Sequence, residues 1–239
     1  MPYEMTYPLP IESSRSERAA FIRRTYAHLA GAILAFVGLE AVVFGLFQDS
    51  LAPVMRQYFQ SPILQLVVVA AFIGSSYLAR YWAMNGGSAA MQYAGLALYV
   101  VVEAIIFVPL LFIALRYVPD GGLLITKAGI LTMCLFAGLS SVVFITRKDF
   151  SFLGPIIAIA GFIALGVIIC AVFFGGFTLG LWFSIAMIVL AAAAILYDTS
   201  NILHHYRMDQ HVAAALNLFA SVAMLFYYVL LALMQSRDR

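Results

Sequence analysis

Four charged residues stand out because they fall inside long apolar stretches of the 239-residue sequence: Glu40, Arg80, Glu103 and Asp198. A charge in hydrocarbon costs roughly 2.5–3.5 kcal/mol on insertion scales, so each such residue is a candidate for a functional role. Carboxylates in this setting can supply oxygen ligands to a cation or take up and release a proton. The pattern therefore suggests cation movement or pH sensing.

Each of the four also has a structural explanation. Arg80 could reach the membrane interface and serve as an anchor, and Glu40 could be protonated and bonded to a neighbouring helix. Asp198 is too short to reach the interface easily, and Glu103 lies near the middle of its apolar run. A functional role is favoured for these last two.

Histidines and cysteines give weaker signals. His204, His205 and His211 lie close together after Asp198, and histidines can titrate between pH 5 and 8. A solvated loop is the favoured explanation, and no metal site is assigned. Two cysteines inside apolar runs lack the spacing of metal ligands and are expected to be small core residues, Cys134 and Cys170.

Composition indicates where these side chains must work. Hydrophobic residues make up 64% of the chain and charged residues 10%, against about 25% charged in an average soluble domain. A soluble protein could not cover that much apolar surface, so the expected surroundings are a lipid bilayer. The formal net charge is +2, and no basic stripe for phosphate is present, which argues against nucleic acid as a partner.

Seven apolar runs are long enough to cross a membrane, which takes about 20 residues in a helix. They are residues 26–47, 63–83, 90–115, 123–145, 152–174, 178–203 and 212–234. The fifth and sixth runs are separated by little more than Gly175-Gly176, so six helices with one broken pair is an open alternative. Seven is favoured because each run is long enough by itself. We therefore expect an all-α integral membrane protein.

The domain organisation follows from these runs. Residues 1–25 form a polar tail, either mobile or an interfacial helix, residues 26–234 form the transmembrane domain, and residues 235–239 form a short C-terminal tail. If the N-terminus is cytoplasmic, the inner segments hold eight Lys and Arg residues and the outer segments five. The positive-inside rule then predicts a cytoplasmic N-terminus and a C-terminus outside.

Helix rise places the candidate residues at different depths. At 1.5 Å per residue, Asp198 lies about 7–8 Å inside the cytoplasmic end of its run. Arg80 and Asn217 fall near the same level, so these three residues are predicted to form a polar layer. Glu103 lies about 10 Å deeper, too far for a direct hydrogen bond to Asp198. Glu40 falls in the outer half of the membrane.

Two motifs make the sequence recognisable. Ile-Leu-Tyr-Asp-Thr-Ser-Asn-Ile-Leu at 195–203 and Thr-Arg-Lys-Asp-Phe-Ser-Phe-Leu-Gly at 146–154 together resemble the Bax inhibitor-1 (transmembrane Bax inhibitor motif) family, and its bacterial branch most closely. The resemblance implies six helices around a central C-terminal helix, and a location in the bacterial inner membrane. It also implies a pH-sensitive calcium leak, gated by an aspartate of the sixth helix paired with one of the seventh.

The resemblance assigns roles to particular residues. Asp198 matches the first aspartate of the gate, and Ser221 stands where the second would be, since residues 212–234 contain no acid. Two carboxylates that share a proton titrate as a coupled pair, which one aspartate cannot reproduce. We assign gating and pH sensing to Asp198, Ser221, Asn217 and Arg80, and place Glu103 and Glu40 along the ion path.

A calcium leak is the leading functional hypothesis, with Ca²⁺ as the permeant ion and no resident cofactor. The alternative, also implied by the resemblance, is a regulator or adaptor of a membrane-anchored ATP-dependent quality-control protease, or of a stress response, acting through residues 1–25. An enzyme is not expected. Tyr197-Asp198 resembles half of a presenilin-like aspartyl protease site, but the Gly-x-Gly-Asp half is missing, as is the Gly-x-Ser-x-Gly of a rhomboid-type protease.

Overall fold

Helices account for nearly all of the described chain. The computed structural model describes residues 14–85, 88–174 and 179–237, and these ranges contain eight helices and no strand. The helices are α1 (Arg15–Leu46), α2 (Gln48–Gln60), α3 (Pro62–Asn85), α4 (Ala89–Tyr117), α5 (Gly121–Thr146), α6 (Leu153–Phe174), α7 (Leu181–His204) and α8 (His211–Arg237).

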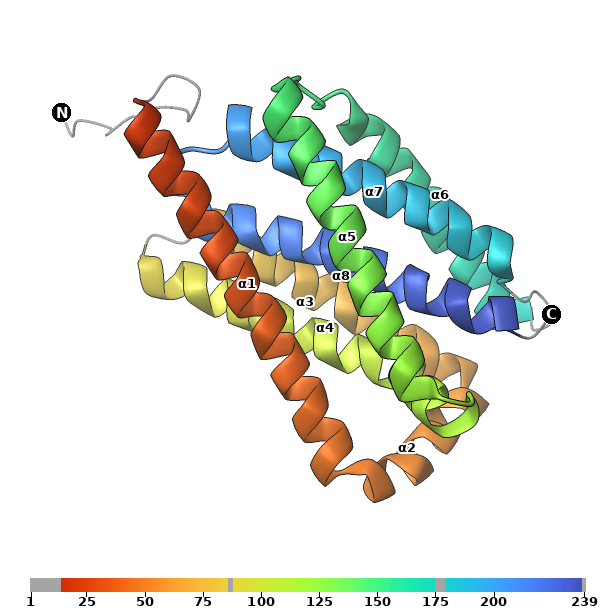
Figure 1. The fold of residues 1–239 in the computed structure, drawn as a ribbon. Coiled ribbons are helices and arrows are strands. Elements are labelled where there is room, and N and C mark those ends of the chain that lie inside the picture. Colours follow the sequence, from red (N-terminus) through yellow and green to blue (C-terminus); the bar gives the residue numbers. More distant parts are fainter. Residues whose placement is uncertain (1–13, 86–87, 175–178, 238–239) are drawn as a thin grey trace.

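Seven of these helices are long and apolar enough to cross a membrane, all except α2. The number confirms the prediction of seven spans. The alternative of a broken pair is excluded, because α6 and α7 are separate helices that each reach spanning length. The start of α1 and the end of α8 lie at opposite ends of the bundle (Figure 1), as an odd number of crossings requires.

The first helix begins earlier than the apolar run predicted. Ser14 caps α1 by accepting a hydrogen bond from the backbone N–H of Glu17, whose side chain bonds back to Ser14 in a capping box. Phe21 and Thr25 are then buried against the bundle. Residues 15–25, expected in the tail, therefore continue the first membrane helix. Residues 1–13 lie outside the described part of the chain.

Helix α2 was not predicted. The segment after Phe47 was expected to be a connection, because it holds polar residues and Pro53, yet residues 48–60 are helical with Pro53 inside the helix. Its 13 residues span about 20 Å, too short to cross the hydrocarbon core. It joins the ends of α1 and α3 at one end of the bundle (Figure 1).

The C-terminal helix lies at the centre. Helix α8 packs on α1, α3, α4, α5 and α7, while α6 packs on α7 and α3 at the periphery (Figure 1). The buried residues of α8 point in every direction around that helix. They include Leu216, Leu218, Leu225 and Leu230, each at 1% exposure or less. This arrangement agrees with the expected architecture of helices around a central C-terminal helix.

Small residues allow the closest helix contacts. Helices α7 and α8 pack against each other, and both carry fully buried alanines such as Ala191 and Ala214; small side chains let membrane helices approach. Between α3 and α4, a Cβ added to Gly95 would lie 2.5 Å from the backbone oxygen of Ala79. Glycine is therefore required there, and the contact fixes α3, which carries Arg80, against α4.

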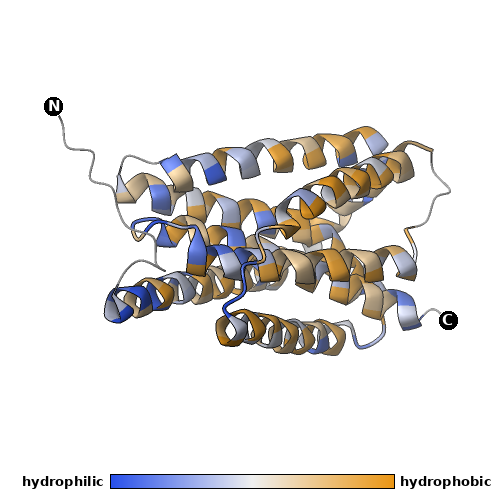
Figure 2. Cartoon of the chain, turned by 90° about the horizontal axis from the view of Figure 1, so that it is seen from above, coloured by the Kyte–Doolittle hydropathy of each residue, from blue (hydrophilic) through white to orange (hydrophobic). Residues whose placement is uncertain are grey.

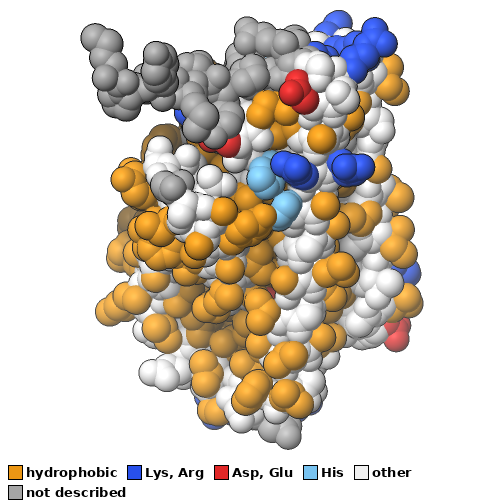
Figure 3. Space-filling model, turned by 90° about the vertical axis from the view of Figure 1, so that its left-hand side faces the viewer, with side chains coloured by type: hydrophobic (Ala, Val, Ile, Leu, Met, Phe, Trp, Pro, Cys, Tyr) orange, Lys and Arg blue, Asp and Glu red, His pale blue; other side chains and the backbone are white. Residues whose placement is uncertain are grey.

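The outer surface is apolar, as a membrane protein requires. Helix α6 buries only Ala164 among its residues, and Phe162 and Phe174 are 75% and 82% exposed. Apolar residues follow the helices along their length (Figure 2) and cover the middle of the face in Figure 3. Cys134 and Cys170 belong to this exposed surface, so the expectation that they are core residues is wrong.

Candidate functional site

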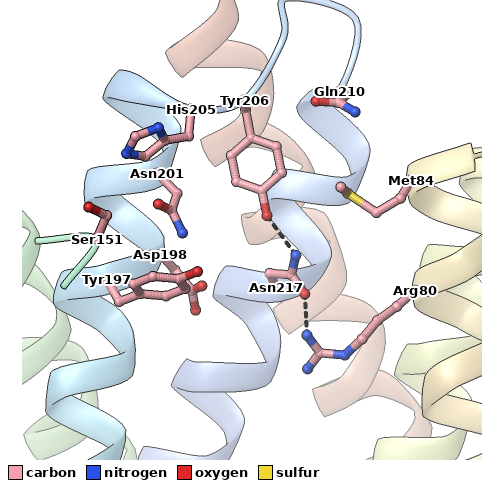
Figure 4. Close-up of a pocket in the computed structure, with 10 residues that line it drawn as sticks. All are labelled: Arg80, Met84, Ser151, Tyr197, Asp198, Asn201, His205, Tyr206, Gln210 and Asn217. Carbon is pink, nitrogen blue, oxygen red and sulfur yellow. Dashed lines mark hydrogen bonds between the residues drawn. The ribbon is translucent and has the colours of Figure 1, made fainter. Parts of the chain in front are cut away.

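A polar pocket of about 530 Å³ lies between α3, α7 and α8. It is near the end of the bundle at which α1, α4 and α8 begin. The residues that line it come from the end of α3, the loop before α6, the end of α7, the α7–α8 loop and the start of α8 (Figure 4). They are Arg80, Met84, Ser151, Tyr197, Asp198, Asn201, His205, Tyr206, Gln210 and Asn217. We call this space the polar pocket.

Asp198 and Ser221 form the innermost polar contact of this region. The hydroxyl of Ser221 on α8 donates to Oδ2 of Asp198 on α7 across 2.5 Å. The two residues are 6% and 8% exposed. A buried carboxylate needs hydrogen-bond donors or a counter-charge to stay charged, and Ser221 supplies a donor.

A second chain of polar contacts crosses the pocket from α3 to the α7–α8 loop. Arg80 donates to the side-chain oxygen of Asn217, and the Asn217 amide donates to the hydroxyl of Tyr206 across 2.6 Å. Figure 4 shows both contacts. The Arg80 guanidinium thus points into the bundle. Burial raises the pKa of the Tyr206 hydroxyl, so Tyr206 stays neutral and Asn217 is held between a cation and a neutral acceptor.

Arg80 also connects the polar pocket to Glu103. Its guanidinium carbon lies 5.5 Å from the centre of the Tyr99 ring, in the range of a cation–π contact. It is close enough to interact electrostatically with both Asp198 and Glu103. Glu103 follows Tyr99 by one turn of α4, is 5% exposed, and its Oε2 has no hydrogen-bond partner among the described residues. Arg80 therefore interacts electrostatically with two buried acids, Asp198 and Glu103.

Around and beyond Glu103 the core is filled by an aromatic cluster, which we define as Tyr99, Phe219, Phe36, Phe107, Phe226 and Tyr227. Phe107 lies at its centre, with ring centroids 4.9 Å from Phe36, 5.7 Å from Phe226 and 5.2 Å from Tyr227. Phe219 contacts both Phe36 and Tyr99 at 6.1 Å. Rings from α1, α4 and α8 thus fill the middle of the bundle.

Glu40 lies on the other side of this cluster. Helices α1 and α4 run in the same direction, since His28 meets Tyr93 near their starts and Phe36 meets Phe107 further along (Figure 1). Glu103 comes one turn before Phe107, and Glu40 one turn after Phe36. Glu40 is 7% exposed and neither carboxyl oxygen has a hydrogen-bond partner among the described residues. The bond to a neighbouring helix suggested for Glu40 is not formed.

The loop between α5 and α6 forms one side of the pocket mouth. Arg147, with φ of 50°, ends α5 in a left-handed conformation. Asp149 then accepts the backbone N–H of Ser151 at 2.9 Å and the Ser200 hydroxyl at 3.3 Å, and lies 3.2 Å from Nε2 of His205. The Ser151 N–H first, and then His205, lower the pKa of Asp149. The motif at 146–154 and the motif at 195–203 are therefore in contact here, through the hydrogen bond from Ser200 to Asp149.

The histidines do not assemble a metal site. His205 pairs with Asp149, His204 bonds the Ser200 carbonyl oxygen, and His211 begins α8 with its ring 5.1 Å from that of His28. Within the part of the chain that the structure describes, no three His, Cys, Asp or Glu side chains converge as metal ligands would.

Helix rise predicts that Asp198, Arg80 and Asn217 lie at one level, and all three line the polar pocket, with Ser221 beside Asp198. It does not place Glu103 or Glu40 in the pocket lining. Tyr206, Asn201 and Gln210 were missed. They lie at the turn between α7 and α8, and the polar composition of residues 201–211 was the signal available for them.

The arrangement can attract a cation and control its progress. Asp198, with oxygens from Asn201, Asn217 and Tyr206 nearby, offers the hard ligands that calcium prefers. Arg80 opposes a cation at the same place by its own charge. The phenylalanines of the aromatic cluster then lie between the pocket and Glu40, and their side chains offer no oxygen ligand to replace a cation's hydration. The lining of the polar pocket thus includes Asp198 but neither Glu103 nor Glu40.

Comparison with known proteins identifies relatives of the whole chain. The family model described as inhibitor of apoptosis-promoting Bax1 matches residues 18–238. An uncharacterized protein of Campylobacter jejuni is 30% identical over 219 residues, which cover 88% of this chain and 90% of that protein. No solved structure matches the chain.

Two shorter matches point in the same direction. An uncharacterized protein of Pseudomonas aeruginosa is 38% identical over 112 residues, 47% of this chain and 50% of that protein. The mouse protein lifeguard 4 is 28% identical over 114 residues, 45% of each chain. In these two cases the match spans half or less of the relative.

Proposed function

This chain belongs to the Bax inhibitor-1 family, and on that basis we propose that it is a pH-sensitive calcium leak protein of a bacterial inner membrane. The polar pocket is its entrance and Asp198 its pH sensor. The observation that carries the proposal is the buried carboxyl of Asp198, held by Ser221 at the inner end of the polar pocket and faced by Arg80.

Charge supports a cation as the permeant species. Asp198, Glu103 and Glu40 are acids buried at successive levels of the bundle. Ionisable residues are costly inside a membrane, so a functional role is the default explanation for them. Each could offer oxygen ligands to calcium in turn. Weak sites in series suit a leak, because an ion must be able to leave each one.

Two features account for a closed resting state. The Arg80 charge lies beside Asp198 and Glu103, so it reduces their attraction for an entering cation. The aromatic cluster around Phe107 blocks the route to Glu40. Opening then requires displacement of Arg80 from Asn217 and separation of rings carried by α1, α4 and α8.

The pH response follows from the charge on Asp198. When Asp198 is ionised, its charge offsets that of Arg80 and can bind calcium. When it is protonated, the pocket retains the Arg80 charge and repels cations. We therefore propose that calcium influx decreases as the pH at this end of the bundle falls.

Purified protein in liposomes containing a calcium indicator tests the proposal. Influx into vesicles with the wild-type chain should exceed influx into empty vesicles at neutral pH. Asp198→Asn should lose that excess, whereas Asp120→Asn, at the exposed start of α5 and without a side-chain cap bond, should retain it. Wild-type influx equal to that of empty vesicles at every pH would exclude a leak.

The adaptor alternative depends on the N-terminal segment. Residues 1–13 lie outside the described part of the chain, and residues 15–25 belong to α1. The structure therefore offers no observation that favours a role as adaptor of a quality-control protease over a leak.

A further inference from the structure

A second space in the molecule lies apart from the polar pocket, between α1 and α4. It is an apolar groove of about 890 Å³, running from Ala27 to Val42 on α1 and from Tyr93 to Val101 on α4; we call it the α1–α4 groove. Small residues of α1 create it, because a Cβ added at Gly31 or Gly38 would meet nothing within 4 Å. Within the described chain, no segment fills this space.

The groove faces the surroundings of the bundle. Val42 and Val101, on its two sides, are 49% and 45% exposed. Both helices span the membrane, so the groove opens to hydrocarbon, where an open apolar channel is filled by a chain of similar polarity. An acyl chain is narrow and flexible enough to lie along a wall made of glycine and alanine.

One end of the groove is basic. His28 lines it and bonds the Tyr93 hydroxyl at 3.0 Å, with the His211 ring 5.1 Å away. Arg24 precedes His28 by one turn on the same face of α1, is exposed, and lies near enough to His211 to interact electrostatically. In Figure 3, Lys, Arg and His side chains gather at one end of an apolar face.

Within the described chain, the acid that acts on His211 at this end of the groove is already paired. The carboxylate that also acts on His211 is Asp209, and it is engaged in an ion pair with Arg207 at 2.9 Å. Helix-end arginines near a membrane surface attract acidic lipids by about 1 kcal/mol each. A groove that is apolar along its length and basic at one end matches a molecule with an acyl chain and a negatively charged headgroup.

We propose that the α1–α4 groove binds an anionic phospholipid from the leaflet at this end of the bundle. One acyl chain lies along Gly31 and Gly38, and the phosphate lies at Arg24 and His28. The inference does not depend on the calcium leak, because the groove is separate from the polar pocket and needs none of its residues.

Photoactivatable lipids test this directly. The full chain is reconstituted in phosphatidylcholine vesicles containing a trace of phosphatidylglycerol or phosphatidylcholine with a diazirine in one acyl chain, and labelled peptides are mapped by mass spectrometry. Residues 27–42 and 93–101 should be labelled about fivefold more by the phosphatidylglycerol probe, as expected for one basic side chain at the headgroup. Equal labelling by the two probes would overturn the proposal.

Variants separate the two parts of the site. Arg24→Gln should reduce labelling by phosphatidylglycerol to the level of phosphatidylcholine, while Arg56→Gln should not. Gly31→Leu with Gly38→Leu should abolish labelling by filling the groove. Gly161→Leu, at a glycine of α6 with equally open surroundings, is the matched control. Unchanged labelling in the double variant would contradict the placement of the acyl chain.

Other occupants give different results. Millimolar inorganic phosphate should not reduce labelling; a loss of the phosphatidylglycerol preference would identify a site for free phosphate instead of a lipid. Cross-linking of two copies of the chain through the groove peptides, with little lipid attached, would identify a protein interface and overturn the lipid assignment.

Discussion

The hydroxyl of Ser221 lies 2.5 Å from the Asp198 carboxylate, across the contact between α7 and α8. The resemblance described above implies a second acid at this position, whereas here a hydroxyl donor faces the carboxylate. The local consequence is a single buried acid whose oxygen is held by a neutral partner.

Changing Ser221 tests this relationship. Ser221→Ala removes a donor to a buried carboxylate and is expected to destabilise the protein by about 1–3 kcal/mol. Ser221→Asp would place two carboxyl groups that must share a proton, so calcium influx should acquire a second titration step. Thermal unfolding in detergent and influx at several pH values measure the two effects.

Ser75→Ala is the control, since Ser75 is only partly buried and its hydroxyl donates to carbonyl groups of its own helix. A Ser221→Ala variant no less stable than Ser75→Ala would contradict the importance of the bond. A Ser221→Asp variant with the titration curve of wild type would show that the two positions are not coupled.

Arg80 is expected to limit the leak. Its charge faces both Asp198 and Glu103, and its contact with Asn217 ties α3 to α8. Arg80→Gln removes the repulsion of an entering cation, and influx at neutral pH should rise by about fivefold, which corresponds to about 1 kcal/mol of repulsion in a water-filled pocket. Arg116→Gln, at the end of α4, is the matched control, and an equal rise in both variants would exclude a specific role for Arg80.

The aromatic cluster should act as a barrier. Phe107 is 1% exposed and contacts three other rings. Phe107→Ala should increase influx and lower stability, by about 3–5 kcal/mol in a soluble core, whereas Phe107→Leu should preserve most of the barrier. Influx into liposomes, measured beside melting temperature, distinguishes an opened path from general unfolding. Reduced or unchanged influx in a folded Phe107→Ala variant would contradict this role.

The contacts of Asp149 with Ser151, Ser200 and His205 should make a pH-dependent contribution to stability. Its pKa is held below the ordinary value of 3.8, chiefly by the Ser151 N–H and also by His205. A lowered pKa gives stability that is present above pH 3.8 and is lost as pH falls through the pKa of the folded state. Both side chains are nearly half exposed, so we expect a loss of no more than about 1 kcal/mol in Asp149→Asn.

Melting temperatures of wild type and Asp149→Asn, compared between pH 7 and pH 3, give the measurement. The difference should shrink as the solution becomes acidic. A difference that grows on acidification would have the opposite sign to that predicted and would reject the contribution of the Asp149 charge.

Regular helix geometry explains why much of the site could be predicted. Seven apolar runs defined the spans, and a constant rise per residue placed Arg80, Asp198 and Asn217 at one level. The Arg80–Asn217 contact joins residues of α3 and α8 that are far apart in sequence. Equal depth makes such a contact possible, and the packing of α3 on α8 brings the two residues together.

The errors come from features that depth and apolarity do not describe. Helix α2 and the start of α1 are too polar to be detected as spans, although Ser14 and Glu17 form a recognisable capping box. Cys134 and Cys170 were expected in the core because free cysteines are commonly buried. In a helix that is apolar on all sides, the sequence does not show which side meets lipid, and both cysteines are exposed. Tyr206 reaches Asn217 through the course of the α7–α8 turn, which composition does not determine.

The central claim is that ionised Asp198 controls a cation path, and one measurement tests it most directly. Calcium influx is recorded as a function of pH for wild type and Asp198→Asn in the same liposomes. The account predicts that wild-type influx falls as the pH is lowered and that Asp198→Asn is low and nearly independent of pH. A variant that conducts as well as wild type, with the same pH dependence, would contradict the assignment of Asp198 as the sensor.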